Sequence, residues 1–122
     1  MTIRQALEHL DSAHRNACAD ADKIQWLSDL DAAVKTEIFD CCEGEETVFE
    51  GYDDRTDRDT ALLTAAPFDQ MYGYYLQARI HYHNGELDRY NNAMALFQAV
   101  YDSFRRHYNR SHRPKGGALR YF

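Results

Sequence analysis

The stretch QMYGYYLQARIHYHNGELDRYNNAMALFQAVYDSF, residues 70–104, decides the fold, because it holds two apolar patterns of helical spacing. The second pattern alternates steps of three and four through Leu87, Tyr90, Met94, Phe97, Tyr101 and Phe104. This is the a/d spacing of a heptad repeat, and it predicts one long helix with those six residues as its core seam. The first pattern, from Met71 to Ile80, predicts a partner helix. Asn84-Gly85 supplies a left-handed stop and a tight reversal between them, so the two helices should form an αα-hairpin.

Two further helices are expected in the N-terminal third of the chain. Thr2 and Gln5 match the capping box S/T-x-x-E/Q, which marks the start of a short first helix. Asp20 or Asp22 is placed to cap a second helix, whose apolar residues recur in steps of three and four over residues 24–38.

The pattern as a whole predicts an all-α fold. We expect a single helical domain, residues 1–122, with a bundle of about four helices built on the long C-terminal αα-hairpin. Gly73 inside the hairpin costs about 1 kcal/mol relative to alanine. The close approach of another backbone is the expected reason for a glycine there.

Residues 43–65 differ from the rest, because eight acidic residues between Glu43 and Asp59 meet only Arg55 and Arg58. The run TVFEGY within this segment is rich in β-branched and aromatic residues and long enough for one short strand. A loop of this length inside a domain is usually functional or disordered. The sequence therefore predicts an extended acidic arm between helices two and three.

The charge of the chain is divided unevenly. Residues 105–122 hold six of the 14 Lys and Arg and none of the 20 Asp and Glu, which leaves the other 104 residues at 8 minus 20, or −12. A basic tail, residues 111–122, on an acidic body favours contacts between copies or with an acidic surface. The alternative is a solvated basic helix end that complements the helix dipole.

The sequence contains no motif typical of a catalytic, phosphate-binding or metal-binding site. The histidines and cysteines lack metal-ligand spacing, DDRTDRD lacks the central glycine and final glutamate of a calcium loop, and no phosphate loop or nucleophile elbow occurs. We therefore predict no enzyme activity, no catalytic residues, no cofactor and no metal site. Three cysteines indicate reduced thiols in a cytoplasm, and the polar start and short apolar runs predict neither export nor a membrane span.

The aromatic residues allow two interpretations. Nine tyrosines in 122 residues either edge the core of one monomer or form a second helical face that meets another copy, since tyrosine suits both settings. Basic residues interleaved with Tyr108, Tyr121 and Phe122 are also typical of nucleic-acid surfaces. The acidic body opposes that interpretation, because it would repel a phosphate backbone.

Three segments carry a family resemblance: KIQWLSDLDAAVKTEIF, EGYDDRTDRDTALL and APFDQMYGYYLQARIHYHNGELDRYNNAMALF. They resemble the small helical proteins encoded in tailed-bacteriophage and prophage structural gene clusters, in particular head-tail connector (adaptor) proteins. The resemblance covers about residues 20–117. Its most specific part places Pro67, Asp69, Tyr72, Asn84, Gly85, Glu86, Tyr90 and Asn91 in the order of that family.

The resemblance implies a virion structural protein, present in the host bacterial cytoplasm during assembly. It implies a homo-oligomeric ring that touches the portal and neighbouring connector subunits, with DNA passing through the channel without sequence-specific binding. By position, the basic partner-binding residues would be Arg105, Arg106, Arg110, Arg113, Lys115 and Arg120. Their acidic counterparts would be Glu45, Glu46, Asp53, Asp54 and Asp57. The alternative function is a cytoplasmic helical regulatory or nucleic-acid-binding protein that uses the same basic end.

Overall fold

The fold is all-α, as predicted. A computed structural model describes residues 1–13, 16–42 and 48–112 and contains four α-helices: α1 (Ile3–Ala13), α2 (Asp20–Val34), α3 (Gln70–His83) and α4 (Leu87–Ser111). A short π-helix, η1 (Lys35–Phe39), continues α2. The described residues contain no strand. An isolated antiparallel bridge joins Thr2 and Ala61, and the short strand expected in the acidic arm is not found among the described residues.

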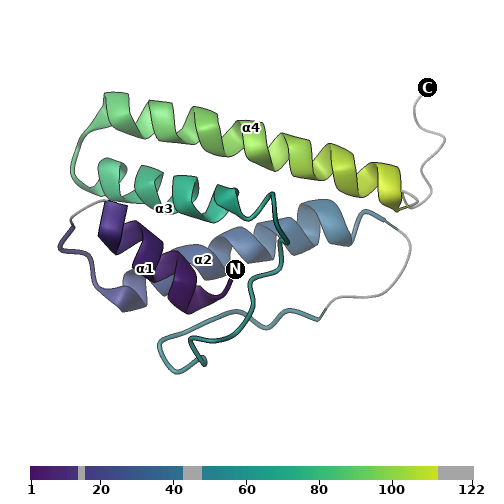
Figure 1. Cartoon of the computed structure of the whole chain (residues 1–122), viewed down its shortest axis with the longest axis horizontal. Helices are drawn as coiled ribbons and strands as arrows, with labels where there is room; N and C mark the ends of the chain where they lie inside the picture. The colour runs from purple at the N-terminus through teal and green to yellow at the C-terminus, as the bar shows by residue number, and fades with distance from the viewer. Residues whose placement is uncertain (14–15, 43–47, 113–122) are drawn as a thin grey trace.

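The helices are stacked in layers. α4 lies along α3 as the outer layer, and α1 and α2 lie on the other side of α3 (Figure 1). The described part of the arm, residues 48–65, runs along the far edge of the α1–α2 layer and not beside α4 (Figure 1). The predicted αα-hairpin is therefore the α3–α4 pair, and it is covered on one side only.

The predicted capping box is present at the start of α1. The Gln5 backbone N–H donates to Thr2 Oγ1 over 3.2 Å, and the Thr2 N–H donates to Gln5 Oε1 over 3.0 Å. The expected cap of α2 is wrong. Its N-cap is Ala19, without a side-chain cap, and the Ala19 carbonyl accepts from the N–H groups of residues 22 and 23. Asp20 and Asp22 lie in the first turn, where carboxylates favour the helix dipole.

The turn between α3 and α4 follows the sequence pattern. α3 ends at His83, and Gly85 takes a φ of +75°, a conformation that glycine adopts without strain. The explanation expected for Gly73 is wrong. A Cβ atom added there would meet no atom within 4 Å, so no other backbone approaches it closely.

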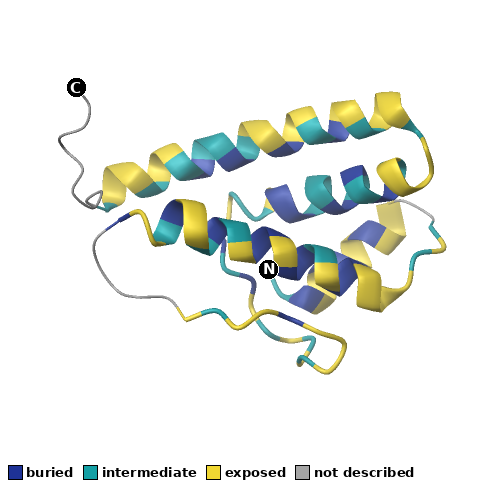
Figure 2. Ribbon diagram, turned by 180° about the vertical axis from the view of Figure 1, so that it is seen from behind, coloured by how far each residue is buried: buried dark blue, intermediate teal, exposed yellow. Residues whose placement is uncertain are grey.

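The core lies between α3 and its neighbours on both sides, and the outer face of α4 is exposed (Figure 2). Within the predicted seam, Phe97, Tyr101 and Phe104 are buried, while Tyr90 and Met94 are half-buried. Leu87 is 60% exposed, so its place in the core seam is wrong. A strict heptad pattern drifts by about 20° per repeat around a straight α-helix. The N-terminal end of the seam, at Leu87, therefore turns away from the interface between α4 and α3.

The arm is fastened to α1 by its backbone. The N–H groups of Ile3 and Arg4 donate to the carbonyls of Thr60 (3.1 Å) and Arg58 (2.8 Å). Leu62, whose N–H donates a hydrogen bond of 2.9 Å to the Met1 carbonyl, is buried in the core. The second half of the arm is thus part of the domain body and closes the core at the edge away from α4.

Candidate interaction surfaces

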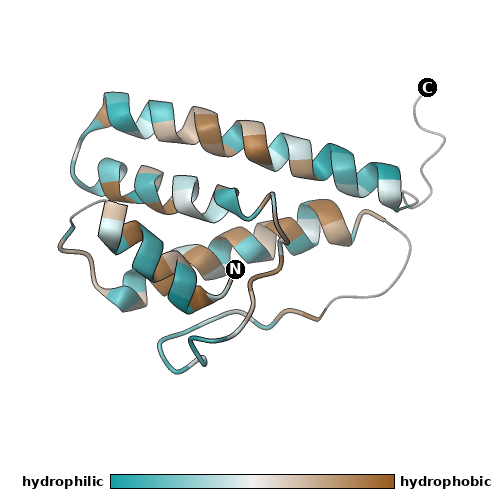
Figure 3. Cartoon of the chain, viewed as in Figure 1, coloured by the Kyte–Doolittle hydropathy of each residue, from teal (hydrophilic) through white to brown (hydrophobic). Residues whose placement is uncertain are grey.

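The basic end of α4 carries three of the six predicted basic residues, and the last turns of the helix are hydrophilic (Figure 3). Arg106 and Arg110 are exposed and form no ion pair with a described residue; Arg106 only donates to Ser103 Oγ over 3.4 Å. Arg105 is used internally, since its Nη2 donates to Glu37 Oε1 over 3.2 Å. Arg113, Lys115 and Arg120 lie outside the described residues.

The acidic turn, residues 53–59, lies at the opposite edge of the molecule from α4 (Figure 1). Its predicted contact residues Asp53, Asp54 and Asp57 are all exposed. Each nevertheless helps to hold the turn: Asp53 and Asp57 accept backbone hydrogen bonds of 2.8 and 2.9 Å from residues 55 and 59, and Asp54 pairs with Arg58 over 3.1 Å. Glu45 and Glu46 lie outside the described residues. The turn and the basic end of α4 are therefore not brought together within one copy.

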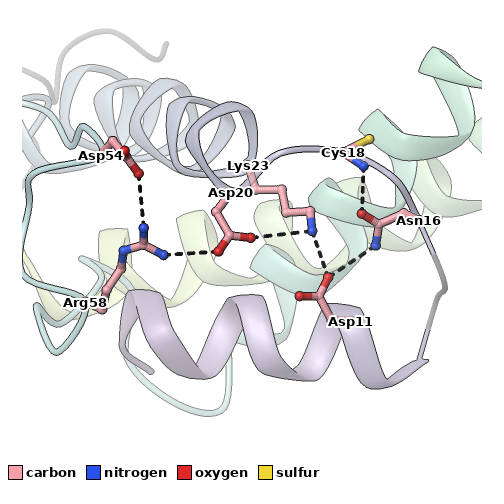
Figure 4. A network of polar contacts seen from close by, with 7 residues as sticks. All are labelled: Asp11, Asn16, Cys18, Asp20, Lys23, Asp54 and Arg58. Atoms are coloured by element: carbon pink, nitrogen blue, oxygen red, sulfur yellow. Dashed lines mark hydrogen bonds and ion pairs between the residues drawn. The ribbon is translucent and has the colours of Figure 1, made fainter.

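An ion-pair network joins the acidic turn to α1 and α2 (Figure 4). Arg58 bridges Asp54 and, over 3.4 Å, Asp20 at the start of α2. Lys23, only 3% exposed, pairs with Asp11 of α1 at 2.8 Å and with Asp20 at 3.8 Å. The hydrogen bond from Lys23 is the main reason why the pKa of Asp11 is lowered. Sequence reasoning missed Lys23, although its position four residues before Leu27 places it beside the apolar stripe.

A second polar cluster lies within the core around Asp31, which is fully buried. Its carboxylate accepts hydrogen bonds of 2.6 Å from the Tyr52 and Tyr72 hydroxyls and one of 3.1 Å from the Leu63 N–H. Burial raises the pKa of Asp31, against these hydrogen bonds, which lower it. Burial also raises the pKa of both tyrosines, and the nearby carboxylate adds to that rise.

The sequence contains a signal for this cluster. Asp31 stands four residues after Leu27 and three before Val34, hence on the buried face of α2. A carboxylate on that face needs buried hydrogen-bond donors. The cluster joins α2, α3 and the arm, so its role is to hold the fold together.

A groove of about 250 Å³ lies between α2 and α4, with Tyr75 of α3 also lining it. The rings of Tyr75, Phe97 and Tyr101 follow one another at centroid separations of 5.2 and 5.4 Å. The carboxylates of Asp29 and Glu37 line the groove from α2 and η1. Apart from Phe97 and Tyr101, which were predicted as core, none of these residues was predicted to form a site, because the groove forms only when two separate helices meet.

Glu37 lines the groove beside Tyr101. It accepts a hydrogen bond of 2.7 Å from the Tyr101 hydroxyl, and the Arg105 guanidinium carbon lies 5.2 Å from the centre of the Tyr101 ring. Burial and the bond to Glu37 raise the pKa of Tyr101 to about 12. Asp29, in contrast, accepts only from Gln25 Nε2, over 2.9 Å, and forms no ion pair in the described part of the chain. The Asp29 side therefore carries the unneutralised charge.

Residues 1–13, 16–42 and 48–112 contain no group of three or more His, Cys, Asp or Glu arranged to hold a metal ion. None of the helices described is both long and apolar enough to cross a membrane. Comparisons of the chain with protein-family models, curated proteins and solved structures find no match.

Proposed function

We propose that this protein is a phage structural protein, a ring-forming head-tail adaptor between portal and tail, and that it acts by assembly. The observation that carries the proposal is the placement of charge on the bundle. Arg106 and Arg110 project from the end of α4 without an ion pair among the described residues, and the acidic turn lies at the opposite edge (Figure 1).

This placement suits contacts between copies. Opposite charges at separate places on one chain cannot satisfy each other within that chain, but they can do so between neighbours. A contact between two different surfaces is heterologous and generates a ring when the rotation closes. The resemblance of residues 20–117 to head-tail connectors supplies the biological setting: portal and tail as partners, the virion as the location, and DNA passing without sequence-specific contacts.

The same charges bear on the passage of DNA. The body outside residues 105–122 has a balance of −12, and phosphate backbones are repelled by surfaces of like charge. A channel lined by such a body would not retain DNA. The basic ends would then face protein partners.

The experiment is a double charge reversal, Arg106→Glu with Arg110→Glu, in a phage or induced prophage that encodes the chain. We expect filled heads without tails in electron micrographs, together with a fall in plaque-forming units. The matched control is Arg106→Lys with Arg110→Lys. It keeps the positive charge at both exposed positions and should leave tails attached.

Two outcomes would overturn the proposal. One is a normal yield of tailed virions from the Arg106→Glu, Arg110→Glu variant. The other is failure to detect the protein in purified virions with a labelled antibody. Its release with the cytoplasmic fraction, combined with retention on DNA, would favour the alternative of a nucleic-acid-binding regulator.

A further inference from the structure

We propose that the groove between α2 and α4 is a binding site for a basic side chain, and that its occupant is Arg110 of a second copy of this chain. This inference rests on the proposed function, because it names the surface that receives the basic end of a neighbour. It adds Asp29 to the acidic turn as an acidic partner of that basic end.

The groove has the chemistry that a guanidinium requires. Three aromatic rings, Tyr75, Phe97 and Tyr101, line it in succession. Phe97 and Tyr101 are buried, so the half-buried Tyr75 offers its ring to an incoming cation. A carboxylate stands on its α2 side at Asp29. Carboxylate and ring together give a planar cation both a hydrogen-bond acceptor and a stacking surface.

One arginine of the chain already binds in this way beside the groove. Arg105 places its guanidinium 5.2 Å from the centre of the Tyr101 ring and donates to Glu37 over 3.2 Å. On the other side of the groove Asp29 lies near Tyr75, whose pKa is raised by burial and further by the Asp29 charge. Arg79 of the same copy is also close to Tyr75, but its guanidinium lies over the Trp26 ring. No arginine of the same copy forms an ion pair with Asp29 in the described residues. The groove therefore has one occupied and one open position for a cation.

The size of the groove favours a side chain over a small-molecule ligand. Pockets for drug-sized ligands measure roughly 300–1,000 Å³, and this groove measures about 250 Å³ and opens to the surface. A single long side chain delivered by another helix fits that volume. The delivering group must be exposed and without an ion pair of its own.

Arg110 meets that requirement. It is exposed in the last turn of α4, and no ion pair within the described chain holds it. The acids of the acidic turn are partly occupied by backbone N–H groups and by Arg58. Asp29, with Gln25 as its one hydrogen-bond donor among the described residues, has more capacity for an incoming guanidinium.

The test is sedimentation velocity of the purified full-length chain over a range of concentrations and salt. We expect wild-type protein to associate, more weakly at high salt because the contact is ionic. Asp29→Lys should weaken association by about tenfold, since an ion pair becomes a contact between like charges. Its matched control is Asp22→Lys on the same helix, exposed and outside the groove, which should associate as wild type does.

The charge swap identifies the occupant. Asp29→Lys combined with Arg110→Glu should restore the association that either single change removes. Circular dichroism of every variant should match the wild type, because both residues are exposed. Should Asp29→Lys lose helix content, Asp29→Asn takes its place as the single variant, and weaker association of that variant than of wild type is then the expected result.

Three results would overturn the inference. The first is that the wild-type protein stays monomeric at every soluble concentration. The second is that the Asp29→Lys protein associates normally. The third is that Asp29→Lys combined with Arg110→Glu does not restore the association that the single changes remove. None of these decides the adaptor function, which is read from tail attachment and from the presence of the chain in virions. If the Asp29→Lys protein associates normally while the Arg106→Glu, Arg110→Glu variant gives heads without tails, the groove is not the binding site for the basic side chain, and the adaptor function stands.

Discussion

Asp31 of α2 and Tyr72 of α3 are both fully buried, and the Tyr72 hydroxyl donates a hydrogen bond of 2.6 Å to the Asp31 carboxylate. The same hydroxyl accepts from the Thr64 N–H over 2.8 Å. Through Tyr52, the arm reaches the second oxygen of Asp31. Three segments distant in the sequence therefore meet at one carboxylate within the core.

Tyr72→Phe should destabilise the fold by about 2–3 kcal/mol. The change removes one donor from a buried carboxylate and one acceptor from a buried N–H, and unsatisfied buried groups cost about 1–3 kcal/mol each or more when charged. Urea denaturation gives the free energy of unfolding. Tyr82→Phe is the control, because Tyr82 is 59% exposed and its loss should stay within about 0.5 kcal/mol. Equal stability of the two variants would show that the Asp31 cluster does not hold the fold.

Asp31 should stabilise the protein more in acid than at neutral pH, relative to the Asp31→Asn variant. The folded-state pKa of Asp31 is raised by burial, so its contribution is fully present below the unfolded pKa of about 3.9 and is lost as pH rises through the folded pKa. We expect the free energy of unfolding of wild type minus that of Asp31→Asn to fall as pH rises from below that value. Urea denaturation at a series of pH values measures it, and a difference that rises instead contradicts the burial of the charge.

Asp11 should show the opposite dependence on pH. The hydrogen bond from Lys23 lowers the folded-state pKa of Asp11, so the stabilisation is present above the unfolded pKa and is lost as pH falls through the folded one. The free energy of unfolding of wild type minus that of Asp11→Asn, measured by urea denaturation at a series of pH values, should therefore shrink on acidification. A difference that is independent of pH would mean that Lys23 finds its partner at Asp20 alone.

Phe97→Ala should cost about 3–5 kcal/mol, the range for large aromatic residues truncated in a core. Phe97 is 6% exposed and contacts the rings of Tyr75 and Tyr101. The neighbouring Leu96 is 51% exposed, and Leu96→Ala should cost less than about 1 kcal/mol. Thermal or urea unfolding of this pair tests whether α4 packs through the face described, and a loss for Phe97→Ala as small as that for Leu96→Ala would contradict it.

The sequence predicted best what depends on local spacing. The capping box at Thr2 and Gln5, the reversal at Asn84-Gly85 and the α3–α4 hairpin all follow from short-range patterns. Those patterns act through hydrogen bonds and apolar contacts between residues close in the chain. Leu87 departed from its pattern because a heptad seam drifts around a straight helix.

Features that depend on contacts between distant segments could not be predicted from local spacing. Neither the Asp31 cluster nor the groove has a complete local signature, because Asp31 pairs with residues 21 and 41 positions away and the groove joins α2 to α4. The arm was identified from its composition. Its docking on α1 through the carbonyls of Arg58 and Thr60 depends on backbone groups, which every residue type carries alike.

The π-helix η1 makes the groove sensitive to the length of the chain. Its hydrogen bond from the Asp40 N–H to the Lys35 carbonyl, 2.8 Å, spans five residues where an α-helix spans four. Deleting one residue between Lys35 and Asp40 would turn this into the four-residue span of an α-helix with the same hydrogen bond, so the residues beyond the deletion would keep their orientation about the helix axis. The change would fall within the turn that carries Glu37, so a single-codon deletion would act on the contact between Glu37 and Tyr101 and leave the rest of the helix in place.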